Sequence, residues 1–199
     1  MNKLYLIRHG ETIWNKIGII QGQADISLTK KGEKQAFLVS NKLKDANIRH
    51  IYSSDLNRAY DTAKIIAKNL DISVSKKEEL REINFGAWQG FTIKYIKKAY
   101  NKEYEIWRNE PYLLTIPKGE SLIKVQERVM RFINRLDESH KYNNILIVSH
   151  SVVIKVIILG LLDLDLVTYR KFSISNCGLT IIEFIEKRKV IKCLNERIL

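Results

Sequence analysis

The sequence is poor in residues that cross-link or interrupt a chain, with two cysteines and two prolines among 199 residues. Cys177 and Cys193 lack the CxxC spacing of a metal or redox pair, so we expect free thiols. No apolar run approaches the roughly 18 residues that span a bilayer, and residues 1–10 lack the long apolar core of a secretion signal. These absences argue against a disulfide scaffold and predict a cytoplasmic protein without a membrane partner.

Length and composition are those of one folded domain. Hydrophobic residues make up 45% of the chain and charged residues 28%, which is enough apolar side chain for a sizeable core. We therefore expect a single domain over residues 1–199. Lysine and arginine outnumber aspartate and glutamate by 34 to 22, a net charge of +12. A positive net charge is compatible with binding to nucleic acid, to an anionic membrane surface or to an anionic small substrate, and it does not distinguish among these partners.

Short apolar strands alternate with segments of helical periodicity. Three such pairs are predicted: residues 3–7 with 29–43, residues 51–53 with 55–70, and residues 145–148 with 152–161. Repeated strand-and-helix units favour parallel strands. The predicted fold is therefore α/β, a three-layer sandwich whose mainly parallel central sheet has helices on both faces.

Two segments depart from this alternation. Over residues 90–110 aromatic and basic residues alternate in a predicted helix, which Pro111 ends. We interpret it as part of a helical lid inserted at about residues 88–120. Near the end of the chain, residues 178–185 and 190–194 have the pattern of two strands, which predicts a hairpin at the sheet edge.

Polar side chains follow each of the three predicted strands. The first strand leads into Arg8 and His9, the second passes through residues 53–55 to Arg58, and the third ends at His150. Ligands of open parallel sheets bind beyond the carboxyl ends of the strands, so these side chains are expected to meet at one rim. Guanidinium groups bind phosphate through paired hydrogen bonds. The predicted ligand is therefore a phosphate.

Motifs spread along the chain make this interpretation more specific. They follow one another as Leu6–Thr12 with Trp14-Asn15, Gln21-Gly22, Leu28–Gly32, Ser54–Ala59, Leu80–Glu82 with Phe85-Gly86 and Trp88, Gly119–Ser121, and Val148–His150. In this order they resemble the histidine phosphatase superfamily, also called the phosphoglycerate mutase-like family, over nearly the whole chain. Among its phosphatases, α-ribazole phosphatases and broad-specificity phosphomonoesterases look similar, and the sequence does not separate them.

The resemblance implies a metal-independent phosphatase that needs no cofactor and acts on small phosphate esters. It implies these roles: His9 as the nucleophile that becomes phosphorylated, Arg8, Arg58 and His150 as groups that hold the phosphoryl group, Glu82 as proton donor and acceptor, and Asn15, Gln21, Gly22 and Ser151 as supporting substrate contacts. A neutral imidazole is a good nucleophile, and fixed arginines stabilise charge without magnesium. Since Glu82 must give and take a proton, we expect its surroundings to raise its pKa.

Two positions depart from the family pattern. Ser151 stands where glycine usually follows the second histidine, and we expect a tighter phosphate pocket there. Gln89 stands where this branch often has glutamate, and we expect this difference to matter little for the reaction.

Phosphoglycerate mutases are longer and carry a tandem arginine pair for the substrate carboxylate, whereas residues 90–119 offer Arg108 and scattered lysines. Hydrolysis is therefore favoured over mutase-type phosphoryl transfer, which stays as the alternative, and a homodimer is left open.

Three alternative hypotheses about function have weaker support in the sequence. Asp163-Leu-Asp165 resembles the nucleophile motif of magnesium-dependent haloacid-dehalogenase phosphatases, but it follows a helix instead of a first strand, so we interpret it as a helix N-terminus. Spacing excludes a cysteine-based phosphatase, because Glu183 stands where an arginine should follow Cys177. A nucleic-acid-binding protein with a phosphate pocket is disfavoured, because the sequence contains no named nucleic-acid motif.

The other histidines and the large aromatic residues receive no catalytic role. His50 is expected before a strand and His140 at the end of a surface helix, away from the predicted rim. The tryptophans and Phe85 are expected to pack in the interior, with Trp14 and Trp88 as candidate pocket walls.

Overall fold

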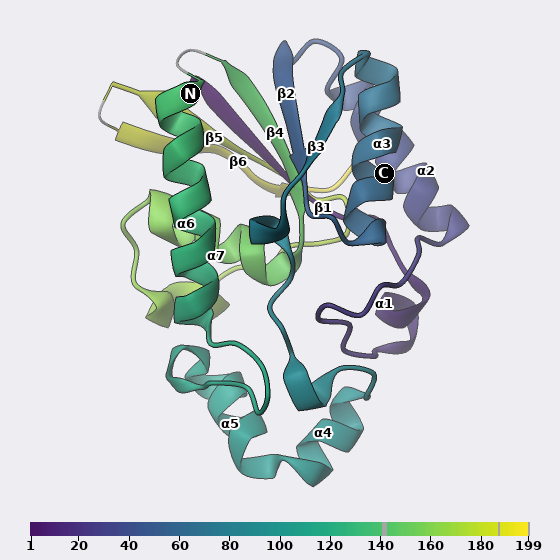
Figure 1. Ribbon diagram of the computed structural model, residues 1–199, viewed down its shortest axis with the longest axis vertical. Helices are drawn as coiled ribbons and strands as arrows, with labels where there is room; N and C mark the ends of the chain where they lie inside the picture. Colours follow the sequence, from purple (N-terminus) through teal and green to yellow (C-terminus); the bar gives the residue numbers. More distant parts are fainter. Residues whose placement is uncertain (141–142, 187, 199) are drawn as a thin grey trace.

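A central sheet organises the computed structural model, which describes residues 1–140, 143–186 and 188–198 (Figure 1). Within these residues the sheet has six strands in the order β3–β2–β4–β1–β5–β6. Their bounds are β1 Lys3–Arg8, β2 Ile48–Ser53, β3 Val74–Lys76, β4 Asn144–Ser149, β5 Leu179–Ile185 and β6 Arg188–Glu196. The pairs among β1, β2, β3 and β4 are parallel, and β5 pairs antiparallel with both β1 and β6. The predicted edge hairpin is confirmed, and its connection includes Lys187, which lies outside the described residues.

Helices fill the intervals between the strands. The α-helices are α1 Ile13–Ile17, α2 Lys30–Lys42, α3 Asn57–Leu70, α4 Ile93–Ala99, α5 Asn101–Asn109, α6 Leu122–Ser139 and α7 Ser151–Leu161. Short 3-10 turns are η1 Glu78–Leu80, η2 Gly86–Trp88, η3 Pro111–Leu113 and η4 Leu166–Arg170. The helix of each predicted strand-and-helix unit is present. None of the described helices is long and apolar enough to cross a membrane.

The two faces of the sheet carry separate hydrophobic cores. Leu4 and Leu6 of β1 pack into the core formed with α6 and α7, whereas Tyr5 and Ile7 point to the opposite face and pack with α2 and α3. This alternation follows from the period of two in a strand. Figure 1 shows the two helix pairs on opposite sides of the sheet. The three-layer α/β sandwich predicted from the sequence is therefore confirmed.

The prediction of one continuous helix over residues 90–110 is wrong, because the segment is divided into two helices, α4 and α5. The two helices meet at Tyr100, whose backbone is not helical, with φ −133° and ψ 49°. The Tyr100 ring packs against buried Trp88, with 6.4 Å between ring centroids. This tertiary contact competes with helical continuity, and the chain turns. As a result α4 and α5 lie at the far end of the molecule, beyond the carboxyl ends of the strands (Figure 1).

Helix α6 and strand β3 are additions to the predicted elements. Ser121 begins α6 by accepting a hydrogen bond from the Lys124 backbone, and the helix buries Val125, Val129 and Leu136 against the sheet. Buried residues three to four positions apart are typical of an amphipathic helix. Strand β3 has three residues and no fully buried side chain, which leaves almost no alternating pattern in the sequence.

Candidate active site

Two imidazoles meet where neighbouring strands end. His9 follows β1 and His150 follows β4, and their ring centroids lie 5.2 Å apart. The Nδ1 atom of His9 lies 2.8 Å from the carbonyl oxygen of Gly10. Because a carbonyl only accepts, Nδ1 carries the proton and Nε2 keeps its lone pair. Burial, reinforced by the positive charge of Arg58, holds the pKa of both histidines well below 6.5, so both rings are neutral near pH 7.

Arg58 is buried in the first turn of α3 and donates to the connection between α1 and α2. Its two terminal nitrogens donate to the carbonyl oxygens of Ala24 at 2.7 Å and Gly22 at 2.6 Å. Gly22 has φ +54°, and a Cβ there would come within 2.1 Å of the Gln89 side chain, so glycine is needed. Burial lowers the pKa of Arg58 to about 10, which leaves the guanidinium charged at neutral pH.

Arg8, the last residue of β1, supplies the second cation. Its Nη1 donates to the carbonyl oxygen of Ile174 at 2.8 Å, and its Nε is buried without a partner among the described residues. Burial lowers the pKa of Arg8, and the nearby Glu82 carboxylate opposes that shift. A buried guanidinium with unused donors is suited to bind an oxyanion.

Glu82 is the acid of the site. It follows η1 and is 8% exposed, and its Oε1 accepts a hydrogen bond from the Ile83 backbone at 3.1 Å. Burial raises its pKa although Arg58 and Arg8 act against the rise, which agrees with the direction expected from the sequence. The neighbouring Arg81 pairs with Asp55 and not with Glu82.

These groups share one pocket of about 260 Å³. Of the residues assigned from the sequence, its lining contains Arg8, His9, Arg58, Glu82, Asn15, Gln21, Gly22 and Ser151. His150 is fully buried beside His9 and is not among the lining residues. Both of its ring nitrogens, like Oε1 of Gln21, have no hydrogen-bond partner within the described chain. Buried polar atoms without partners are uncommon in folded proteins, and a phosphate would supply acceptors for the imidazole.

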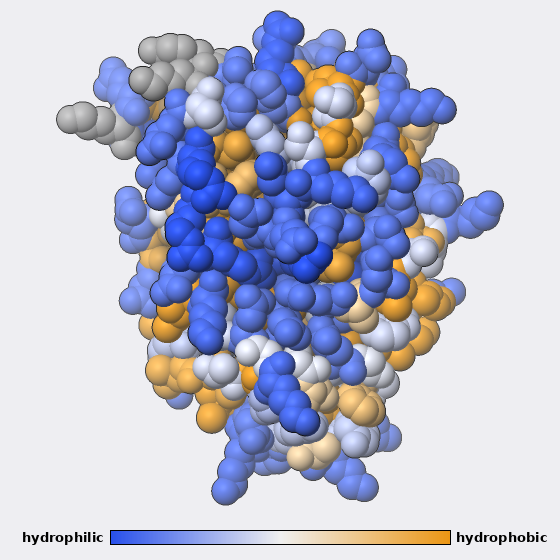
Figure 2. All heavy atoms as spheres, in the orientation of Figure 1, coloured by the Kyte–Doolittle hydropathy of each residue, from blue (hydrophilic) through white to orange (hydrophobic). Residues whose placement is uncertain are grey.

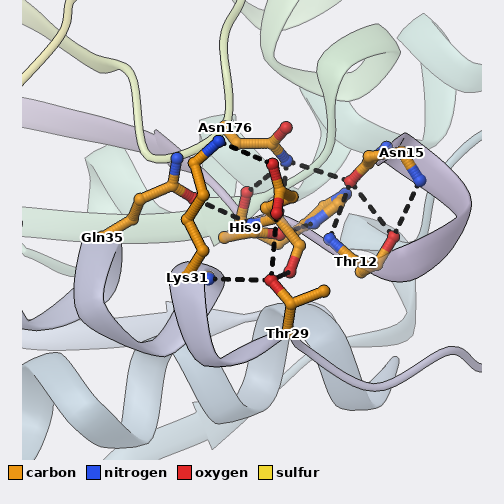
Figure 3. Close-up of polar contacts among 10 residues, drawn as sticks. His9, Thr12, Asn15, Thr29, Lys31, Gln35 and Asn176 are labelled. Carbon is orange, nitrogen blue, oxygen red and sulfur yellow. Dashed lines mark hydrogen bonds and ion pairs between the residues drawn. The ribbon is translucent and has the colours of Figure 1, made fainter. Parts of the chain in front are cut away.

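Asn176 holds the loop after β1 that carries His9, a role that the sequence does not predict. Its Nδ2 donates to the His9 carbonyl at 3.0 Å and to Oδ1 of Asn15 at 3.1 Å (Figure 3). Asn15 also closes the start of α1, where its Oδ1 accepts from the Thr12 backbone at 3.2 Å. The loop from β1 is thus fixed from two sides. Asn176 lies in a connection without a motif, so no local sequence pattern marks it.

The aromatic walls of the pocket differ from those expected. Trp88 is fully buried and Trp14 does not line the pocket, whereas Phe85 and Trp107 do, together with Tyr169. The expectation for Trp14 and Trp88 is therefore wrong. Trp88 stays behind the wall, stacked on Phe85 with 6.4 Å between centroids. Trp107 reaches the pocket from α5, a position that depends on the break between α4 and α5.

The residues set aside in the sequence occupy other places. Asp165 accepts a hydrogen bond from the Val167 backbone at 2.8 Å and caps η4, as expected for a helix N-terminus. Cys177 and Cys193 are both free, and burial raises the pKa of the Cys177 thiol to about 12. His50 lies within β2 instead of before a strand, and its ring stacks on His140 at 4.0 Å, apart from the pocket. Among the described residues, no group of three or more histidine, cysteine, aspartate or glutamate side chains is placed to hold a metal ion.

Comparison with known proteins defines the class of protein. The family model of the histidine phosphatase superfamily (branch 1) matches residues 4–197. The chain belongs to this superfamily, and the predictions of a histidine phosphatase and of phosphomonoester hydrolysis are confirmed.

Individual relatives bear different names. The chain is 35% identical over 195 residues to phosphoserine phosphatase 1 of Hydrogenobacter thermophilus, covering 98% of this chain and 92% of the relative. It is 35% identical over 184 residues to the probable phosphoglycerate mutase GpmB of Erwinia tasmaniensis, covering 90% and 84%. The crystal structure of the α-ribazole phosphatase from Shigella flexneri superposes with a TM-score of 0.88 at 32% identity, covering 99% of this chain and 98% of that one.

Proposed function

We propose that this protein hydrolyses small phosphomonoesters in two steps through a phosphohistidine on His9. The observation that carries the proposal is a buried, neutral imidazole with a fixed Nδ1 proton in a pocket shared with Arg8 and Arg58. In the first step Nε2 of His9 attacks phosphorus and the ester P–O bond breaks. The electron pair goes to the leaving oxygen, which takes a proton from Glu82.

The second step returns the enzyme to its starting state. Glu82, now a carboxylate, accepts a proton from water as the water oxygen attacks phosphorus. The P–N bond to His9 breaks, and its electron pair returns to Nε2. Inorganic phosphate leaves, and the proton on Glu82 is ready for the next ester. A raised pKa suits this residue because it must be protonated in one step and ionised in the next.

Arg8, Arg58 and His150 are proposed to stabilise the charge on the phosphoryl oxygens. The two guanidiniums are charged at neutral pH, and burial makes their interaction with a phosphate stronger than it would be in water. His150 is neutral here, so it donates through one N–H. A bound dianion would raise its pKa and favour the second proton. The backbone N–H of Ser151 lies at the start of α7, where the helix dipole favours an anion.

Hydrolysis fits the pocket better than phosphoryl transfer between two positions of a glycerate. A tandem pair of arginines for a substrate carboxylate is missing from the described lining, whose arginines are Arg8 and Arg58.

We further propose that residues 1–199 form one catalytic domain that acts in the cytoplasm, with the segment at about 88–120 as a lid. No nucleic-acid partner is proposed, because the sequence contains no named nucleic-acid motif. Figure 2 shows hydrophilic side chains over the middle of the face in view and apolar groups toward its edges.

The test compares His9→Ala with wild type on p-nitrophenyl phosphate and on an alkyl phosphate, in excess EDTA. His50→Ala serves as the control, because His50 is a histidine outside the pocket. Wild type and the control should release phosphate without added metal, and His9→Ala should not. Activity that disappears in EDTA and returns with magnesium, or that survives in His9→Ala, would contradict the proposal.

A further inference from the structure

The backbone of Gly10 lies between the nucleophile and two side chains that have no part in the reaction described so far. The Gly10 carbonyl oxygen accepts a hydrogen bond from Nδ1 of His9, 2.8 Å away. The same oxygen lies 3.2 Å from Nδ2 of Asn176, and the Gly10 N–H donates to Oγ1 of Thr62 at 3.0 Å. The residue that accepts the Nδ1 hydrogen bond of the nucleophile is therefore held through both its N–H and its carbonyl.

Thr62 joins Gly10 to the helix that carries Arg58. It is fully buried in α3, one turn after Arg58, and its Oγ1 donates to the Arg58 carbonyl oxygen at 2.7 Å. Because the single hydroxyl proton is used there, the hydroxyl oxygen is left to accept from the Gly10 N–H. Thr62 thus holds Gly10 in a fixed relation to α3, whose first turn supplies a phosphate-binding guanidinium.

Asn176 holds the other side of the loop with one amide group. Its Nδ2 lies 3.0 Å from the His9 carbonyl oxygen, 3.2 Å from that of Gly10 and 3.1 Å from Oδ1 of Asn15 (Figure 3). Each of these three atoms is an acceptor, since Oδ1 of Asn15 in turn accepts from the Thr12 backbone. The side chain must therefore present its NH2 group, because a carboxylate oxygen in this place would face three other oxygens.

Close packing leaves the backbone of Gly10 little room to move. A Cβ atom on Gly10 would come within 2.5 Å of the Gly32 carbonyl oxygen, so the loop rests directly on the first turn of α2. Rotation of the Gly10 carbonyl away from His9 would also break its bond to Asn176, and a shift of the whole residue would break the bond to Thr62. The acceptor for the Nδ1 proton is thus in place before a substrate binds, which favours a reactive geometry.

We propose that Asn176 and Thr62 are positioning residues, which keep the proton of His9 on Nδ1 by holding the Gly10 carbonyl against the ring. The proposal rests on the reaction proposed above for His9. Hydrogen bonds at the ring decide which nitrogen of a neutral histidine carries the proton. A His9 ring protonated on Nε2 has no lone pair directed at phosphorus. Loss of the Gly10 acceptor therefore removes reactive enzyme without changing the charge of the site.

The first experiment locates the proton directly. In protein labelled with ¹⁵N-histidine, long-range ¹⁵N–¹H spectra near neutral pH distinguish a ring protonated on Nδ1 from one protonated on Nε2. The His9 signals are those that are missing from His9→Ala. Wild type should show the Nδ1–H form of His9, whereas Asn176→Ala and Asn176→Asp should contain the Nε2–H form as well or instead. Unchanged His9 signals in Asn176→Ala would overturn the proposal.

Asn195→Ala is the matched control, because Asn195 holds the same connection at Ser175. Its Oδ1 accepts from the Ser175 backbone at 2.7 Å and its Nδ2 donates to Oγ of Ser175 at 3.3 Å. Asn195 also has φ +53°, where alanine is strained, so the control should have a lower melting temperature and the His9 proton of wild type. A change of the His9 signals as large as in Asn176→Ala would mean that a loosened connection, and not the Asn176 amide, moves the proton.

The second experiment follows the rate at which the phosphoenzyme forms from p-nitrophenyl phosphate in a single turnover. Asn176→Ala should slow this rate about 10²-fold, the scale of a misplaced reacting group. Inhibition by inorganic phosphate should change little, because Arg8 and Arg58 keep their own contacts. A parallel loss of rate and of phosphate affinity would show a general disturbance of the pocket and would overturn the proposal.

Thr62 is tested with two variants that differ in the hydroxyl. Thr62→Ser keeps the hydroxyl and should form the phosphoenzyme at nearly the wild-type rate. Thr62→Val has a similar shape but leaves the Gly10 N–H without its acceptor, so it should be slower. Equal rates in the two variants would contradict the role given to Thr62.

His9→Ala measured in parallel separates the two proposals. If this variant still forms a phosphoenzyme, the reaction proposed for His9 is wrong, whatever the spectra show. If it forms none and the His9 signals are the same in wild type and Asn176→Ala, the positioning inference alone fails.

Discussion

His9 and His150 occupy equivalent positions on two neighbouring parallel strands. The register pairs Arg8 with Ser149, so the next residue of each strand is a histidine, and the two rings lie 5.2 Å apart. Their surroundings nevertheless differ. Nδ1 of His9 is bonded to the Gly10 carbonyl, whereas both nitrogens of His150 have no partner within the described chain. The same strand geometry thus supplies one imidazole with a fixed lone pair and one that is free to donate to an oxygen.

The pH dependence of kcat/KM for an alkyl phosphate should reflect the pKa values of Glu82 and His9 in the free enzyme. Glu82 must be protonated to assist the leaving oxygen, so kcat/KM falls as the pH rises through its raised pKa. His9 must be neutral, and its pKa is held well below 6.5, so its protonation should not lower kcat/KM as the pH falls through 6.5. A pH profile of kcat/KM measures both effects. A decline that begins as the pH falls through 6.5 would mean that His9 titrates like an ordinary histidine.

Glu82→Gln should slow hydrolysis of an alkyl phosphate by about 10²- to 10⁴-fold, the usual contribution of a general acid and base. The effect on formation of the phosphoenzyme from p-nitrophenyl phosphate should be smaller, since that leaving group needs no proton. Single-turnover rates on both esters check this, with melting temperature as the control for folding. Near-normal turnover on the alkyl ester would remove Glu82 from proton transfer.

Arg58→Lys should be impaired in both activity and stability. Lysine keeps the charge but lacks the two separate terminal nitrogens with which Arg58 donates to the Gly22 and Ala24 carbonyl oxygens. Each buried carbonyl left unpaired costs about 1–3 kcal/mol, so the melting temperature should fall along with kcat/KM. Arg131→Lys, an exposed arginine on α6, is the matched control. An unchanged melting temperature with lost activity would mean that Arg58 serves the phosphate alone.

The strand ends could be predicted from the sequence because their signals are local. An apolar run followed by Arg8-His9 or by Ser149-His150 marks both the strand and the side chains that its end presents. Parallel pairing then brings the ends together, and no further information is needed. For this reason Arg8, His9 and His150 could be named from the strand ends alone. Glu82, Asn15, Gln21 and Gly22 were expected only from the resemblance to the family.

The aromatic wall of the pocket could not be predicted because it depends on contacts between distant segments. The sequence of residues 90–110 predicts one helix, and nothing in it marks the turn at Tyr100, whose ring packs on Trp88. That turn brings Trp107 to the pocket and leaves Trp88 behind it. Asn176 is a similar case, since its three hydrogen bonds to the nucleophile loop reach back more than 160 positions along the chain.

The most direct test of the mechanism is to find the phosphorylated residue. Wild type mixed with a labelled phosphate donor and quenched without acid should yield a phosphoenzyme that is labile to acid and stable to base, with the label on His9. His9→Ala should show no label, and His150→Ala should become labelled slowly but still on His9. A label on His150, or one that remains on the His9→Ala protein, would contradict the account.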